Sequence, residues 1–235
     1  MADDHGPAGP VLRNWNGRRG CGTNVVTTYE HAMFGGTVAL ALGCHRNREW
    51  MLVAVASAAA ALPDWDALSL AFGATAYATG HRVWGHNLVV ASATGALVGG
   101  FGYLCRLSPR VRRAAVHYWP QAETSDLIVP FSGRRLTKYI IVGLIASLSH
   151  LPADMVYSGH PQLRSWPIPL LWPFSDQGWV WPLVAWGDIT TTLIFIGEMF
   201  ALYRWPQQAR GIAGLTLLGV HGHIGFCWWI HGVGN

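Results

Sequence analysis

The chain alternates between long apolar runs and short polar connections. The clearest run, residues 85–106, holds about 20 residues without an acidic side chain, enough for a helix of about 30 Å that crosses a bilayer. Three further runs predict membrane helices: 136–151, which is shorter but strongly apolar, 181–203 and 211–230.

The apolar runs of the amino-terminal half are shorter. Residues 31–44 and 50–62 offer about 13 residues each, and 68–79 is similar, so each fits a short span, a re-entrant segment or a buried helix. Residues 153–180 are rich in proline and tryptophan and too broken by proline for one helix. The pattern predicts an all-α, polytopic transmembrane helical bundle with some short or re-entrant helices.

The composition agrees with a membrane protein. Only 12% of residues are charged, about half the fraction of an average soluble domain, and the chain has 13 Trp and 28 Gly. The basic residues lie between apolar runs and form no stripe, so nucleic acid is not an expected partner. Residues 1–30 are polar and glycine-rich, without a signal-peptide pattern, and predict a flexible tail. Residues 31–235 are expected to form a single transmembrane domain.

The basic residues also predict an orientation. Most of them lie in three connections, after the first apolar run, around residues 106–138 and at 204–210, and the positive-inside rule places these in the cytoplasm. The polar residues of interest then gather on the opposite, non-cytoplasmic side, provided that 68–79 dips into the bilayer and returns. Arg13, Arg18 and Arg19 in the tail do not follow this placement.

Three short motifs carry side chains that bind metals. They are LPDWD with Asp64 and Asp66, HRVWGHN with His81 and His86, and SHLPADMVYSGH with His150, Asp154 and His160. Carboxylates two residues apart can reach one cation where the backbone turns. A histidine and an aspartate at i and i+4 share a helix face if the helix continues through Pro152. Each motif alone also fits a structural interpretation, as a helix-ending turn, an interfacial loop or a simple His–Asp pair.

Two more polar residues are expected within or at the start of membrane segments. His31 opens the first apolar run, and Asp188 is predicted about two turns inside the run 181–203. An ionisable group in a membrane segment marks a functional site, an orienting partner for a histidine, or a polar contact between helices. The motifs together predict a divalent metal centre, of zinc or else manganese or iron, with one or two ions. Its candidate ligands are His31, Asp64, Asp66, His81, His86, His150, Asp154 and Asp188.

The order and spacing of these motifs, with LLWPF at 170–174, resemble the YdjM-type family of predicted membrane-bound, metal-dependent hydrolases of bacteria and archaea. The resemblance covers roughly residues 31–190 and implies that the same eight residues are the polar positions of a site in a prokaryotic inner membrane. The sequence departs from the family pattern at Gly85 and Asn87, where threonine and serine are usual, and at Tyr157 and Ser158, near a usual threonine. The acids and imidazoles are kept.

The resulting hypothesis is hydrolysis of a phosphoester or other ester in an amphiphilic lipid or lipid-linked substrate. Asp66 or Asp64 would accept the proton of a metal-bound water, and Arg82 and Asn87 would contact the substrate, with Arg82 as a phosphate clamp. An ion- or proton-coupled transporter and a non-catalytic membrane scaffold are the alternatives. A membrane diiron oxidation enzyme would need adjacent-histidine motifs that the sequence lacks.

Overall fold

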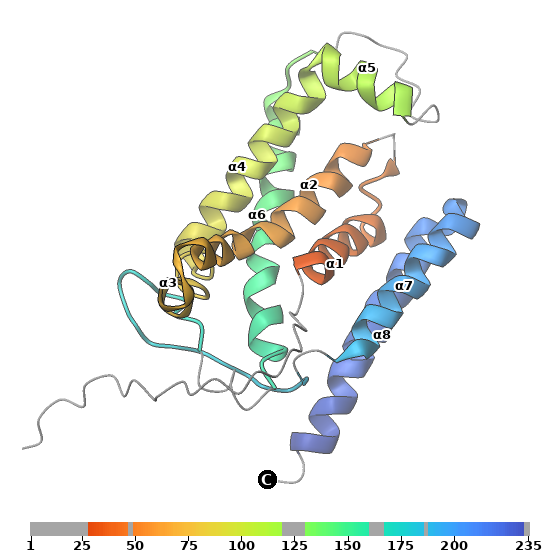
Figure 1. The fold of residues 1–235 in the computed structure, drawn as a ribbon. Coiled ribbons are helices and arrows are strands. Elements are labelled where there is room, and N and C mark those ends of the chain that lie inside the picture. The colour runs from red at the N-terminus through yellow and green to blue at the C-terminus, as the bar shows by residue number, and fades with distance from the viewer. Residues whose placement is uncertain (1–27, 47–48, 119–129, 160–166, 186–187, 233–235) are drawn as a thin grey trace, which may run out of the picture.

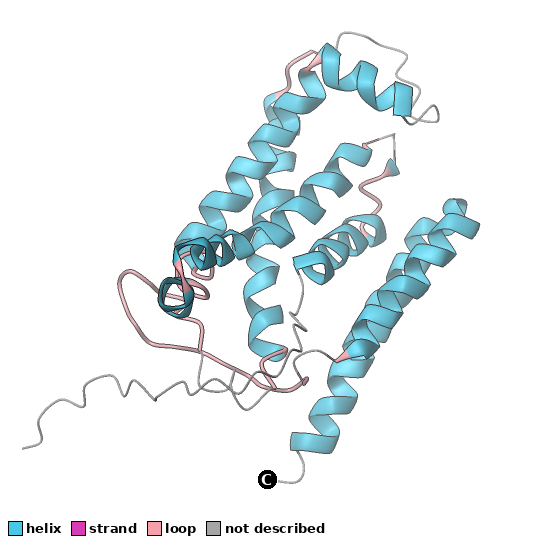
Figure 2. Cartoon of the chain, viewed as in Figure 1, coloured by secondary structure: helices cyan, strands magenta, loops and turns pink. Residues whose placement is uncertain are grey.

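A computed structural model describes residues 28–46, 49–118, 130–159, 167–185 and 188–232. Within these ranges the chain forms helices and no sheet (Figure 2). A single isolated bridge joins Ile168 and Trp179. The predicted all-α class is therefore confirmed. The α-helices are α1 (Thr28–Ala41), α2 (Trp50–Ala61), α3 (Ala74–Gly80), α4 (Leu88–Leu107), α5 (Pro109–Tyr118), α6 (Gly133–Val156), α7 (Ile189–Arg204) and α8 (Ala209–Gly232), and the 3-10 helices are η2 (Leu62–Phe72) and η3 (Pro206–Gln208).

Among the described residues, four helical segments are long and apolar enough to cross a membrane. They are Trp50–Phe72, which joins α2 to η2, Leu88–Leu107, Gly133–Val156 and Pro206–Ile230. Large apolar side chains on their outer faces, such as Leu97, Phe101 and Leu218, are exposed, as expected of surfaces that meet lipid. The helix α3 has 7 residues, too few to cross about 30 Å of hydrocarbon.

Two element boundaries in the structure differ from those predicted from the sequence. The run 181–203 is not one helix, because α7 begins only at Ile189 and has 16 residues. Asp188 therefore does not lie two turns inside a helix; it caps the helix, and its Oδ1 accepts the Thr190 backbone N–H at 2.7 Å. Residues 1–27 of the predicted tail lie outside the described residues, and residues 28–30 already belong to α1.

Glycines bring α4 and α6 into close contact. Gly95 and Gly99 lie one turn apart on α4 and face Gly143 and Tyr139 of α6. A methyl group at Gly99 would lie 2.7 Å from Ile140 Cα and closer still to the Tyr139 carbonyl oxygen. Small residues spaced by four are typical of membrane helices whose backbones approach each other. This contact fixes α4 and α6 against each other beside the polar end of the bundle.

The helix α2 packs across this pair through small side chains. Ala56, Ala59 and Ala60 of α2 are buried against Ala39 of α1 and Ala146 of α6. In Figure 1, α7 and α8 lie side by side along the remaining flank. The α1–α2 connection, α5 and the α7–α8 turn lie toward one end of the molecule, while α3 and the carboxyl ends of α6 and α8 lie toward the other.

The α4–α6 contact gives a testable prediction. Gly99→Ala places a methyl group inside the helix contact and is expected to cost about 1–3 kcal/mol, because the facing atoms are backbone and cannot move aside. The melting temperature in detergent should fall by several degrees. Gly100→Ala is the matched control, since no atom lies within 4 Å of a methyl group there. Equal melting temperatures for the two variants would contradict this packing.

Candidate metal centre

The three polar motifs meet at one end of the bundle. LPDWD lies in η2, where Pro63 occupies the first turn, and HRVWGHN forms the connection into α4. Residues 149–156 of the third motif form the last turns of α6, which continues through Pro152 and so presents His150 and Asp154 on one face. Four of the predicted ligand side chains converge there: Asp64, His86, His150 and Asp154.

The four converging atoms are two imidazole nitrogens and two carboxylate oxygens. His86 Nε2 lies 3.0 Å from His150 Nε2, 3.0 Å from Asp154 Oδ2 and 3.4 Å from Asp64 Oδ1. His150 Nε2 lies 3.4 Å from the same Asp64 oxygen and 3.7 Å from Asp154 Oδ2. His86, His150 and Asp154 are buried, and Asp64 is nearly so.

The remaining nitrogen of each histidine fixes its tautomer. His150 Nδ1 lies 2.7 Å from the Ala60 carbonyl oxygen, which only accepts hydrogen bonds, so Nδ1 carries the proton. His86 Nδ1 donates in the same way to Asp66 Oδ2 at 2.9 Å. Both Nε2 lone pairs then point at each other and at two carboxylates. Four acceptors this close require a positive charge among them.

The spacing fits a tetrahedral ion. Zinc bonds of about 2.0–2.1 Å to nitrogen and oxygen place tetrahedral ligands about 3.3–3.4 Å apart. The five separations given above run from 3.0 to 3.7 Å around that value. This donor set, which lacks a thiolate, suits zinc, manganese or iron. The group can therefore hold a metal ion.

Asp66 forms a second group that is satisfied without an ion. Its Oδ1 accepts from His81 Nδ1 at 2.7 Å, and its Oδ2 accepts from His86 Nδ1 and from the Gly85 backbone N–H, both at 2.9 Å. The carboxylate is completely buried. Asp66 thus orients His86 from behind, as carboxylates do for metal-binding histidines.

The surroundings of His86 favour positive charge. Burial lowers the pKa of its imidazole, but the carboxylates of Asp154, Asp64 and Asp66 raise it more, so the pKa lies well above the usual value. A position that stabilises a proton so strongly among acceptors is also suited to a cation. His86 is the residue that the two groups share.

Asp154 links the centre to two more predicted residues. Its Oδ1 accepts from His31 Nε2 at 3.0 Å, and the His31 ring stacks on His150 with centroids 3.7 Å apart. The Arg82 guanidinium lies 3.9 Å from Asp154 Oδ2 and donates to Ser158 Oγ at 3.0 Å. Arg82 is buried and has a positive φ of 64°, which turns the connection sharply beside the site.

The other predicted site residues lie apart from the four-atom group. Asp188 pairs with His223 Nε2 at 3.3 Å, in addition to capping α7. Asn87 caps α4, with its Oδ1 accepting from Val90 N and its Nδ2 donating to the carbonyls of residues 83 and 84. His160 lies outside the described residues.

Three contributors to the site were not among the predicted site residues. The Ala60 carbonyl orients His150, and Thr28 Oγ1 donates to Asp64 Oδ2 at 2.8 Å. Gly85 lies so close to the Pro63 carbonyl oxygen that a side chain there would overlap it. The glycine that departs from the family pattern therefore allows the connection to approach LPDWD.

An apolar cavity of about 310 Å³ opens beside the centre. His31 forms part of its wall, together with Phe34, Phe195 and Val220. The cavity lies between α1, α6, α7 and α8, and its lining combines apolar side chains with the polar residues Glu30, His31, Ser149, Thr191 and His221. The bundle can thus accommodate an apolar chain that extends to the polar cluster.

A model of the YdjM inner membrane protein family matches residues 26–232. No curated protein and no solved structure matches the chain. The matched range contains all four converging residues, and with four membrane-length helices it indicates an integral inner membrane protein. The resemblance seen in the motifs is confirmed: the chain belongs to the YdjM inner membrane protein family.

Proposed function

We propose that this protein is a membrane-bound, metal-dependent hydrolase that cleaves a phosphoester, or another ester, of a lipid or lipid-linked substrate. The observation that carries the proposal is the convergence of Asp64, His86, His150 and Asp154 on one point, with both histidine tautomers fixed by hydrogen bonds. A scaffold would not need two imidazoles and two carboxylates directed at one point.

The four converging residues would hold the ion, with zinc as the first choice. Such an ion lowers the pKa of a bound water and neutralises charge on the substrate oxygens. The protein's own part is to keep the ligands in place: Ala60 and Asp66 hold the two imidazoles, and Thr28 holds the Asp64 carboxylate.

Asp64 and Asp66, the two aspartates predicted to accept a proton, have different surroundings, which supports different roles for them. The Asp66 carboxylate accepts hydrogen bonds from three N–H donors, which leaves it unsuited to take a proton and supports an orienting role. Asp64 is less enclosed and has a single hydroxyl donor on its Oδ2, so we assign proton transfer to Asp64. Arg82, beside Asp154, is positioned to stabilise a phosphate group at the centre.

The apolar cavity supports an amphiphilic substrate. A head group at the four-atom site would leave its apolar chain facing Phe34, Phe195 and Val220, while His31 lies at the junction. The described parts of the three basic connections lie toward one end of the bundle in Figure 1, and α3 and the carboxyl end of α6, beside the site, lie toward the other. By the positive-inside rule, we propose that the site faces the non-cytoplasmic side.

The first prediction concerns metal content. Detergent-purified protein incubated with zinc, manganese or iron and then desalted should retain about one ion per chain, as a single four-ligand site would. The double variant His86→Ala, Asp154→Ala should retain none, because it removes two of four ligands. Elemental analysis by plasma mass spectrometry measures both.

A matched control uses His45→Ala with Asp176→Ala. These residues have the same chemistry but lie outside both groups of converging side chains. The control should keep the metal. Equal metal content in all three proteins, or no metal in the wild type at saturating concentrations, would remove the basis of the proposed activity.

The second prediction concerns turnover. The metal-loaded protein should hydrolyse phosphoesters, and a substrate with an acyl or isoprenoid chain should have a higher kcat/KM than its head group alone, because only the former fills the apolar cavity. His86→Ala should fall to the background rate. Phosphate or alcohol release, measured by chromatography, gives the rates.

Two results would contradict the proposed hydrolase activity. Undiminished hydrolysis by His86→Ala would assign the activity to a contaminant or to another site. A metal-loaded protein that cleaves no ester but moves a divalent ion into proteoliposomes would replace the hydrolase with a transporter.

A further inference from the structure

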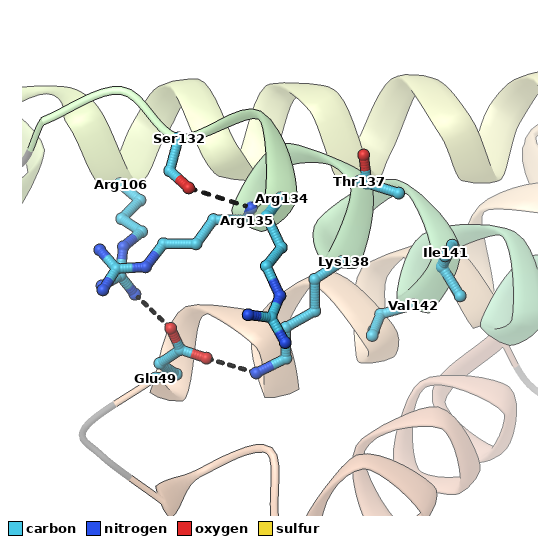
Figure 3. A pocket seen from close by; sticks show the side chains of 9 residues that line it. All are labelled: Glu49, Arg106, Ser132, Arg134, Arg135, Thr137, Lys138, Ile141 and Val142. Carbon is cyan, nitrogen blue, oxygen red and sulfur yellow. Dashed lines mark hydrogen bonds and ion pairs between the residues drawn. The ribbon is translucent and has the colours of Figure 1, made fainter.

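A second cavity lies at the other end of α4 and α6, far from the metal centre along both helices. It is open, has a volume of about 1020 Å³, and is bordered by the carboxyl end of α4, the amino end of α6 and the start of α2. Figure 3 shows the side chains that surround it. Its residues are Glu49, Arg106, Ser132, Arg134, Arg135, Thr137, Lys138, Ile141 and Val142.

The lining is strongly cationic. It holds four basic side chains and one carboxylate, a net charge of +3. Glu49 is already shared, since it pairs with Lys138 at 2.5 Å and with Arg106 at 3.4 Å (Figure 3). Among the described residues, no carboxylate pairs with the guanidinium groups of Arg134 or Arg135, which are exposed. The excess positive charge therefore makes the cavity suited to bind an anion.

The same face of α6 changes from charged to apolar along the helix. Arg134, Lys138, Ile141 and Ile145 follow one another at spacings of four, three and four residues, so they form one stripe. Ile141 and Ile145 are about half exposed. From Arg134 to Ile145 the helix rises about 16 Å, roughly half of the 30 Å hydrocarbon core, which is the depth of one leaflet. A soluble anion would make no use of this apolar wall.

We infer that this cavity binds the head group of an anionic phospholipid, with the phosphate among Arg134, Arg135 and Lys138 and the acyl chains along Ile141 and Ile145. The amphiphilic stripe matches the two parts of such a lipid, and basic pockets between membrane helices are suited to anionic head groups. Glu49 holds Lys138 and Arg106 toward the cavity, so the site is partly organised before the lipid arrives.

The experiment compares lipid binding to the full chain by native mass spectrometry from detergent. Phosphatidylglycerol should bind in preference to phosphatidylcholine with the same acyl chains. The double variant Arg134→Gln, Arg135→Gln should lose about 30-fold in phosphatidylglycerol affinity, since each basic residue near the membrane surface contributes about fivefold. Phosphatidylcholine binding should not change.

The matched control removes the same charge at the same end of the molecule. Arg110 and Arg113 are exposed on α5 and lie outside the cavity lining, so Arg110→Gln, Arg113→Gln should keep wild-type selectivity. The melting temperature of each variant checks that folding is intact.

Two results would overturn the inference. One is an equal loss of phosphatidylglycerol affinity in both double variants, which would indicate only a diffuse positive surface. The other is displacement of phosphatidylglycerol by excess inorganic phosphate, which would indicate a site for a soluble anion.

Discussion

The mutual repulsion of four hydrogen-bond acceptors is the constraint on which this structure depends. His86 and His150 each use one nitrogen to donate outward, to Asp66 and to the Ala60 carbonyl, so their other nitrogens face the carboxylates of Asp64 and Asp154 as acceptors. Buried acceptors without a donor are costly in a low-dielectric interior. A positive charge at this point, whether a proton on His86 or a bound metal ion, would offset the repulsion.

Helix packing brings these residues together from distant parts of the chain. Backbone contact between α4 and α6 at Gly95, Gly99 and Gly143 fixes where the connection before α4 meets the last turns of α6. Buried alanines hold α2 against α6, which places the Ala60 carbonyl at His150. The bundle therefore uses small residues for helix contacts and brings the four converging side chains together at one end.

The sequence predicted much of this arrangement because its periodicity and motif spacing are local. The i, i+4 pair of His150 and Asp154 shares a face of α6 as expected, and the HRVWGHN and LPDWD motifs lie beside it. The different roles of Asp64 and Asp66 were not predictable, because two carboxylates two residues apart look alike until Gly85 and His81 enclose one of them.

Other features depend on tertiary contacts that leave no trace in a motif. The Ala60 carbonyl contributes through its backbone, which any residue type would offer. The boundary at Asp188 was misread because apolar residues precede it, although an aspartate before Thr190 can also cap a helix. The cationic cavity at the opposite end requires α2, α4 and α6 to be placed before Glu49 and Arg134 can be seen as neighbours.

Anomalous diffraction at the zinc absorption edge, from crystals of the zinc-loaded protein, would test the proposed metal centre itself. The proposed four-ligand site predicts one peak, about 2.0–2.2 Å from His86 Nε2, from His150 Nε2 and from a carboxylate oxygen of Asp64 or Asp154. A peak at another position would contradict it. So would crystals saturated with zinc that show no peak there.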